Sequence, residues 1–83
     1  MQITIKLYAM LSKYLPPDAV HNVSHLEVVE AASVGTVLEQ LRLPRELVHL
    51  VLLNGVYISP PQHQNTVLKE ADVLAVWPPV AGG

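Results

Sequence analysis

The stretch Ser33-Val34-Gly35-Thr36-Val37-Leu38-Glu39-Gln40-Leu41-Arg42 decides the fold, because it predicts one helix between two groups of strands. Its apolar residues recur at the i, i+3, i+4 and i+7 spacing of a half-buried helix. Ser33 is a typical N-cap, and Pro44 favours an end after Leu43. The pattern therefore predicts a helix from Val34 to Arg42, although Gly35 lowers its helix propensity.

The segment before the helix predicts two paired strands. Residues 2–9 alternate, with Ile3, Ile5 and Leu7 on one side and polar residues together with Tyr8 on the other. This period of two indicates a half-buried strand. Residues 10–15 could form one helical turn that Pro16 and Pro17 end. The β-branched residues in 21–30 predict a second strand, which we expect to pair antiparallel with the first.

Three further strands are predicted after the helix. Residues 48–53 are almost all apolar, which is typical of a central strand buried on both faces. Asn54-Gly55 is a strong hairpin signal, so 56–58 would return as a short strand. Residues 59–65 read as a loop and 66–69 as a single helical turn. Residues 72–77 predict the last strand, in a central position.

This order predicts an α+β fold, a mixed sheet of about five strands with one main helix packed on one face. A right-handed crossover would bring the later strands beside the first. The arrangement is the ubiquitin-like β-grasp. We expect one domain over residues 1–79, followed by a flexible C-terminal tail over 80–83.

Composition points to protein partners. Only 14% of the 83 residues are charged, against about 25% in an average domain, which leaves apolar surface for a docking face. A net charge of −2 with five Lys and Arg argues against nucleic acid. No membrane-spanning run, signal peptide or cysteine is evident, so we expect a cytoplasmic protein with neither disulfides nor thiolate metal sites.

The sequence ends in Trp77-Pro78-Pro79-Val80-Ala81-Gly82-Gly83. Proline restricts φ and stiffens the exit from the last strand, whereas glycine has no Cβ and fits a narrow channel. Such an ending is either a frayed terminus or a slender tip whose reactive group is a terminal carboxylate.

The chain resembles the MoaD/ThiS family of sulfur carriers over most of its length. The segments that carry the resemblance are 5–11, 33–38, Leu53-Asn54-Gly55, 66–72 and above all the Pro-Pro-Val-Ala-Gly-Gly ending at 78–83. One residue departs from the family pattern: Ala71 stands where the family usually has glycine. Glycine there suggests a positive φ, which alanine tolerates poorly, and the turn at Ala71 could be re-formed locally.

The resemblance implies carrier chemistry at Gly83, with Gly82 as its slim neighbour. A ubiquitin-activating-type enzyme would use ATP to adenylate Gly83, and sulfur would then replace AMP to give a thiocarboxylate. The chain itself would bind no cofactor and would not be an enzyme alone. Residues 80–83 extended would reach roughly 13 Å, at about 3.3 Å per residue.

The resemblance also implies a docking surface. Its residues would be Tyr8, Tyr57, Trp77, Pro78, Pro79, Val80 and Ala81. Alternation independently places Tyr8 on the polar side of its strand, and exposed aromatic residues are typical of interfaces. For Tyr57 and Trp77, the alternative is that they belong to the core.

Two acceptor pathways and one other class of function stay open. The Pro-Pro ending favours the small subunit of molybdopterin synthase, with the synthase large subunit as partner. A carrier that serves thiazole synthase in thiamine biosynthesis, or another thiocarboxylate pathway, is the alternative. A ubiquitin-like interaction or conjugation module would use the same fold.

Other chemistries have weaker support in the sequence. His21 and His25 are four residues apart, which suits a metal only on a helix, and His49 and His63 lack supporting ligands. No metal site is therefore expected. The serines lack a nucleophile-elbow context. Arg42 and Arg45 lie where the helix dipole favours cations.

Overall fold

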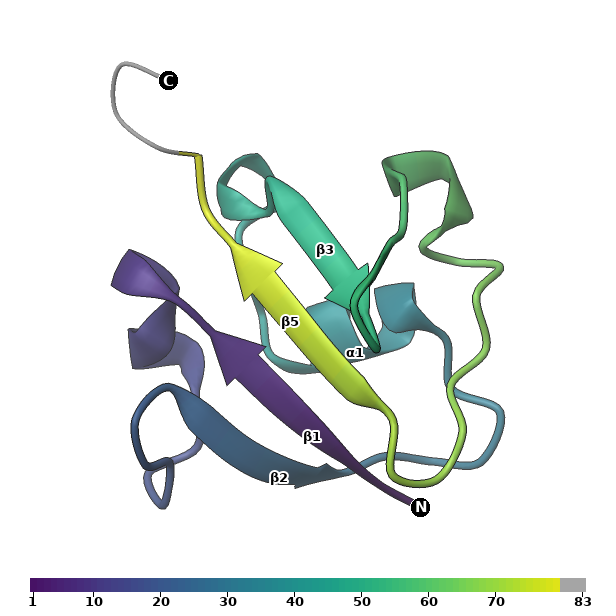
Figure 1. Ribbon diagram of the computed structural model, residues 1–83, viewed down its shortest axis with the longest axis horizontal. Helices are drawn as coiled ribbons and strands as arrows, with labels where there is room; N and C mark the ends of the chain where they lie inside the picture. The colour runs from purple at the N-terminus through teal and green to yellow at the C-terminus, as the bar shows by residue number, and fades with distance from the viewer. Residues whose placement is uncertain (80–83) are drawn as a thin grey trace.

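The computed structural model describes residues 1–79 and gives them the predicted mixed architecture (Figure 1). These residues form five strands, one α-helix and three short 3₁₀ helices. In chain order the elements are β1 (Gln2–Leu7), η1 (Ala9–Tyr14), β2 (Val23–Glu27), α1 (Val34–Gln40), η2 (Arg45–Leu47), β3 (Leu50–Leu53), β4 (Val56–Tyr57), η3 (Pro60–Gln62) and β5 (Val73–Trp77). Val80, Ala81, Gly82 and Gly83, named in the predictions for the tail, lie outside the described residues.

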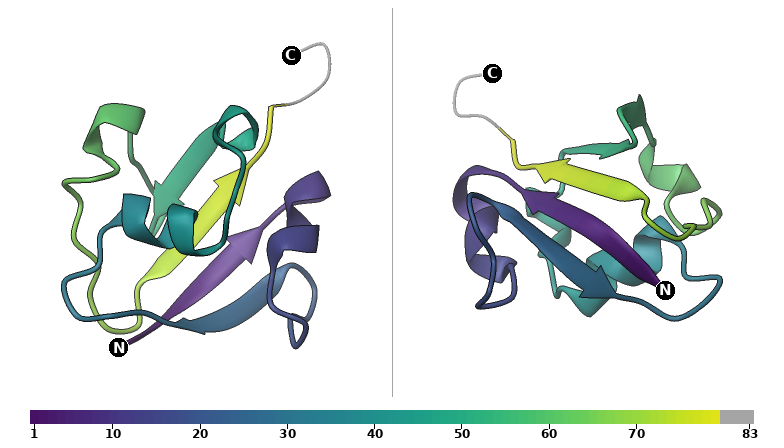
Figure 2. Two further views of the ribbon diagram at one scale, coloured as in Figure 1. Left: turned by 180° about the vertical axis from the view of Figure 1, so that it is seen from behind. Right: turned by 60° about the horizontal axis from the view of Figure 1, so that its bottom comes forward.

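The strands form one sheet in the order β2-β1-β5-β3-β4. β1 and β5 run parallel at its centre, and the other neighbours pair antiparallel. This order confirms three predictions: β1 pairs antiparallel with β2, the last strand is central, and a crossover brings it beside the first strand. Helix α1 lies behind the sheet in Figure 1 and in front of it in the left view of Figure 2. The ubiquitin-like β-grasp fold is confirmed, and one face of the sheet is left bare.

The core lies between this helix and the sheet. Ile3, Ile5 and Leu7 are buried, as the alternation in β1 predicted. They pack in one cluster with side chains of α1, β3 and β5, namely Val34, Val37, Leu38, Val51, Leu74 and Val76. Burying each such side chain stabilises the fold by about 1.5–3 kcal/mol, so the cluster fixes α1 on one face only.

Helix α1 begins as predicted and ends two residues early. The Oγ atom of Ser33 accepts a hydrogen bond from the Thr36 N–H at 3.1 Å, which confirms the N-cap. Arg42 has a φ of +58°, and the N–H groups of Arg42 and Leu43 donate to Glu39 and Leu38 oxygens at 2.9 and 3.2 Å. These bonds form a Schellman motif that stops the helix before Pro44.

Glycine is needed at position 35 because a loop packs over the first turn of the helix and leaves no room for a Cβ. The Gly35 N–H donates to the His63 carbonyl at 2.8 Å, and a Cβ at this position would collide with the side-chain amide of Gln64. The loop after η3 therefore packs directly on the start of α1.

The helical turn predicted at 66–69 is wrong. Val67 instead forms a β-bridge with Ser33, and the Leu68 N–H donates to the Ala32 carbonyl at 2.8 Å. Leu68 is buried and Val67 is exposed, as in an extended segment. Pairing with the chain that enters α1 overrides the local propensity.

The prediction of a strand buried on both faces at 48–53 is also wrong. β3 starts at Leu50, and Val51 is its one fully buried residue. Leu50 and Leu52 are half-buried, because they point to the side of the sheet that no helix covers.

Candidate functional site: a docking face beside the tail

Eight residues of the bare side of the sheet form what we call the outer face (Figure 1). The strand register places them in two rows across neighbouring strands. The row nearer the tail is Tyr8, Trp77 and Leu50, and the next is Val23, Lys6, Ala75, Leu52 and Tyr57. Seven of the eight side chains are apolar or aromatic; Tyr57 is exposed, Ala75 is buried and the others are half-buried, so this is a partly exposed apolar patch of the kind that binds other proteins.

The aromatic residues of the outer face lie where a docking surface needs them. The Tyr8 and Trp77 rings stack with centroids 4.5 Å apart and an interplanar angle of 8°. Tyr57 is 53% exposed. Trp77 and Tyr57 therefore belong to the outer face rather than to the core, and their role in docking stays a prediction.

The outer face adjoins the point where the chain leaves the sheet. The Tyr8 N–H donates to the Val76 carbonyl at 3.2 Å, and the His49 N–H donates to the Trp77 carbonyl at 3.0 Å. Pro78 is buried and Pro79 is exposed. The chain is thus hydrogen bonded on both sides up to Trp77, beside the aromatic stack.

The Asn54-Gly55 hairpin is confirmed and is bonded to the turn before β5. Asn54 and Gly55 have φ values of +52° and +84°. The Asn54 side chain donates to Asp72 Oδ1 at 3.0 Å and accepts from the Val73 N–H at 2.8 Å. Asp72 Oδ2 accepts from the Lys69 N–H at 2.8 Å. This network ties the hairpin tip to the start of the strand that carries Trp77.

Ala71 keeps the backbone conformation that glycine would have. Its φ is +71°, and its N–H donates to the Gln2 carbonyl at 2.8 Å. Hydrogen bonds on both sides of the turn hold the chain path, and the alanine accepts the left-handed conformation that glycine favours.

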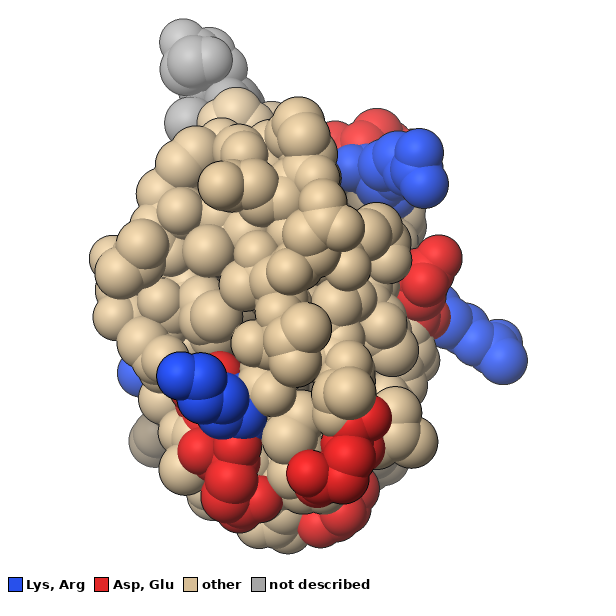
Figure 3. All heavy atoms as spheres, turned by 90° about the vertical axis from the view of Figure 1, so that its right-hand side faces the viewer, with Lys and Arg blue, Asp and Glu red and all other residues tan. Residues whose placement is uncertain are grey.

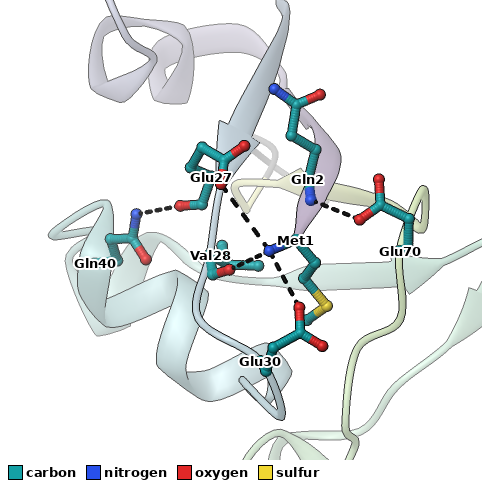
Figure 4. Close-up of polar contacts among 7 residues, drawn as sticks. All are labelled: Met1, Gln2, Glu27, Val28, Glu30, Gln40 and Glu70. Atoms are coloured by element: carbon teal, nitrogen blue, oxygen red, sulfur yellow. Dashed lines mark hydrogen bonds and ion pairs between the residues drawn. The ribbon is translucent and has the colours of Figure 1, made fainter.

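The end of the sheet away from the tail is held by polar contacts (Figure 4). The Met1 ammonium donates to the Val28 carbonyl at 2.9 Å and lies 3.2 Å from Glu30 Oε2. The Gln2 N–H donates to Glu70 Oε1 at 3.0 Å, and Gln40 Nε2 donates to the Glu27 carbonyl at 3.2 Å. Charged and polar groups therefore gather at this end, away from the aromatic stack of Tyr8 and Trp77.

A second surface carries no charged residue over a long segment. Residues 54–68 contain no Asp, Glu, Lys or Arg. Figure 3 shows the corresponding side largely without charged atoms, with acidic and basic groups gathered below and along one edge. On the helix side, a groove of about 550 Å³ lies between α1 and η3; its lining includes Leu38 and Pro61 and also the charged residues Glu39 and Arg45.

The histidines are dispersed rather than grouped. His21 lies in a turn with a φ of +51°, and His25 lies in β2, so their four-residue spacing does not place them on one helix face. Within residues 1–79, no group of three His, Cys, Asp or Glu side chains could hold a metal ion. Likewise, no helix in that range has the length and apolarity needed to cross a membrane.

Sequence reasoning missed part of the outer face. Leu50, Leu52 and Ala75 lie in apolar runs, where alternation gives no signal of which side chains face outward. Lys6 was placed on the polar side of β1 by alternation, but its position within an apolar patch depends on the sheet register.

Comparisons with known proteins agree with the fold. The model of the ThiS family matches residues 17–83. The solution structure of the Haloferax volcanii HVO 2177 protein is 26% identical, with a TM-score of 0.77, covering 100% of this chain and 87% of that one. No curated protein matches the chain by sequence.

Two more solved structures share the fold at lower identity. Small archaeal modifier protein 1 of Haloferax volcanii is 23% identical, with a TM-score of 0.67, covering 95% of this chain and 98% of that one. A chain in the complex of subunits 1 and 2 of molybdopterin-converting factor from Helicobacter pylori is 21% identical, with a TM-score of 0.57 and full coverage of both chains.

Proposed function

The chain belongs to the ThiS family of ubiquitin-like sulfur-carrier proteins, and from that premise we propose that Gly83 is its reacting residue. In this proposal the Gly83 carboxylate is converted to a thiocarboxylate that donates sulfur to an acceptor. The chain acts as a co-substrate, and the catalytic groups belong to its partners.

One observation carries the proposal: an apolar face lies directly beside the exit of a Gly-Gly tail. The stack of Tyr8 on Trp77 is part of that face, and the backbone is bonded up to Trp77. A partner that docks on the outer face would receive residues 80–83 at a fixed starting point. Proximity of this kind converts a bimolecular encounter into an oriented reaction.

The chemistry explains why a partner enzyme and ATP are needed. A carboxylate is a poor electrophile, so its oxygen first attacks the α-phosphate of ATP and pyrophosphate leaves. The terminal sulfur of an enzyme persulfide then attacks the acyl adenylate and AMP leaves. Cleavage of the resulting acyl disulfide by a second thiol gives the thiocarboxylate and an enzyme disulfide. ATP is thus used by a ubiquitin-activating-type enzyme and needs no site on this chain.

We propose molybdopterin synthesis as the acceptor pathway, with this chain as the small subunit of molybdopterin synthase. The Pro78-Pro79 ending supports this branch, and the Helicobacter pylori complex is an example of such a pairing on the same fold. The proposed acceptor complex is with the synthase large subunit.

Two alternatives share the carrier surface. The ThiS family match supports a carrier for thiazole synthase in thiamine biosynthesis. The likeness to small archaeal modifier protein 1 supports a modifier, in which a lysine amine of a target attacks the adenylate-derived acyl group instead of sulfur.

The intact mass of the chain tests the proposal. The chain ending at Gly83 is incubated with an adenylating enzyme, ATP and a persulfide donor. We expect one oxygen to be replaced by sulfur, and deletion of Gly83 to abolish this change while thermal unfolding stays the same. An unchanged mass with an enzyme that forms the adenylate would overturn the sulfur-carrier function. A mass gain by a lysine of a target protein would identify the modifier instead.

The acceptor is identified in a second step. The thiocarboxylated chain is mixed separately with the molybdopterin synthase large subunit and with thiazole synthase, each with its own substrate. Sulfur transfer in the first mixture alone is the expected result, and transfer only in the second would move the chain to the thiamine pathway.

A further inference from the structure

Lys6 is the one charged residue among the eight residues of the outer face. The register pairs it with Val23 of β2 on one side and with Ala75 of β5 on the other. Tyr8, the residue directly after β1, lies on the same face and stacks on Trp77. Lys6 therefore has apolar neighbours in three directions, and the polar row of Thr4 and His25 borders it in the fourth.

The Lys6 ammonium has no anionic partner within the described part of the chain. The ion pairs found there are those of the Met1 ammonium with Glu27 and Glu30. Glu27 faces the same side as Lys6, but the register places it two rows farther along β2, opposite Gln2. In the isolated domain, water must solvate the ammonium of this half-buried residue.

Docking of a partner on the outer face would remove that water. An ammonium that becomes buried without a counter-ion costs several kcal/mol, which would cancel much of the gain from the apolar contacts around it. A carboxylate placed opposite would satisfy the charge, and in a desolvated setting such a pair also gives specificity. A wholly apolar partner surface would be rejected by the same lysine.

We infer that the partner surface that docks on the outer face carries an Asp or Glu carboxylate opposite Lys6, set within an apolar patch. The inference rests on the proposed function, since it describes the surface of the adenylating enzyme that receives the tail. It makes Lys6 a specificity-determining residue that touches the partner and takes no part in the chemistry at Gly83.

A different placement of the Lys6 side chain predicts the opposite effect of one substitution on binding affinity. The long Lys6 side chain could extend past Val23 and keep its ammonium in water at the β2 edge during docking. Removing the charge while keeping the apolar stem would then leave affinity unchanged or raise it. Lys6→Met removes the charge and keeps an apolar stem, because methionine has an unbranched apolar side chain.

The experiment uses the enzyme that adenylates the wild-type chain. ATP–pyrophosphate exchange is measured against carrier concentration for the wild type, Lys6→Met, Lys6→Glu and the control Lys69→Met. Lys69 is an exposed lysine whose bond to Asp72 comes from its backbone N–H, which the substitution keeps. Thermal unfolding of each variant shows that the fold is retained.

We expect Lys6→Met to raise the half-saturating carrier concentration by about thirty-fold or more, because the partner carboxylate is left buried and unpaired. The exchange rate at saturation should stay the same, and Lys6→Glu should be weaker still. Lys69→Met should behave as the wild type. A Lys substitution at one acidic residue of the enzyme surface should restore binding of Lys6→Glu.

Two other results would overturn the inference, and they are distinguishable. If the wild type is adenylated and Lys6→Met saturates at the same or a lower carrier concentration, no carboxylate faces Lys6, although the carrier function stands. If no adenylating enzyme adenylates the wild type, the proposed function fails and the inference that rests on it fails too.

Discussion

Asn54 and Asp72 are hydrogen bonded side chain to side chain, with Asn54 Nδ2 3.0 Å from Asp72 Oδ1 across 18 positions of sequence. The pair joins the tip of the β3–β4 hairpin to the turn that leads into β5. Both residues belong to segments on which the family resemblance rests, Leu53-Asn54-Gly55 and 66–72. Their physical role is to fix the start of the strand that ends at Trp77.

Asn54→Ala should destabilise the domain by about 2–3 kcal/mol, since it removes two side-chain hydrogen bonds and places alanine at a positive φ. Urea unfolding measures the change. The control is Asn65→Ala, an exposed asparagine whose φ is not positive, which should stay within about 0.5 kcal/mol of the wild type. Equal stability of the two variants would show that the Asn54 network contributes nothing.

Ala71→Gly should stabilise the domain by about 0.5–1 kcal/mol. The left-handed conformation costs a residue with a Cβ about 1–2 kcal/mol, part of which glycine loses again through the greater entropy of its unfolded chain. The melting temperature in a calorimeter measures the gain. Ala19→Gly is the matched control at a residue without a positive φ, and it should destabilise. A loss of stability in Ala71→Gly would mean that this turn has another conformation.

Tyr8→Ala and Trp77→Ala should be coupled by about 0.5–1.5 kcal/mol in a double-mutant cycle on unfolding free energy, because the rings stack on each other. The control cycle combines Tyr57→Ala with Trp77→Ala, two residues that lie in different rows of the outer face. Their effects should add to within about 0.5 kcal/mol. Additive effects in the first cycle would show that the stack does not stabilise the fold.

Much of the fold could be predicted from local patterns. The alternation in β1 fixed which of its side chains are buried, and Ser33 marked the start of α1. The end of α1 could not be predicted in the same way. It depends on Arg42 in a left-handed conformation that sequence statistics assign to glycine or asparagine, so the Schellman motif gave no signal.

The candidate site was predicted in part for a related reason. Tyr8 stands in an alternating strand, and its outward side chain could be read directly. Leu50 and Leu52 stand in an apolar run, whose two sides look alike until the neighbouring strands are known. The segment 66–69 was assigned to a helical turn because its partner, the chain entering α1, is more than thirty positions away.

The central place of β5 also bears on how the protein is made. β1 is synthesised first and β5 last among the described strands, yet they are direct neighbours. Until Leu74 and Val76 have been added, the middle of the sheet is missing and β3 has no connection to β1. A ribosome that stalls before this point releases a chain that lacks the central strand and the Tyr8–Trp77 stack. An unfinished copy therefore cannot compete with complete copies for their partners.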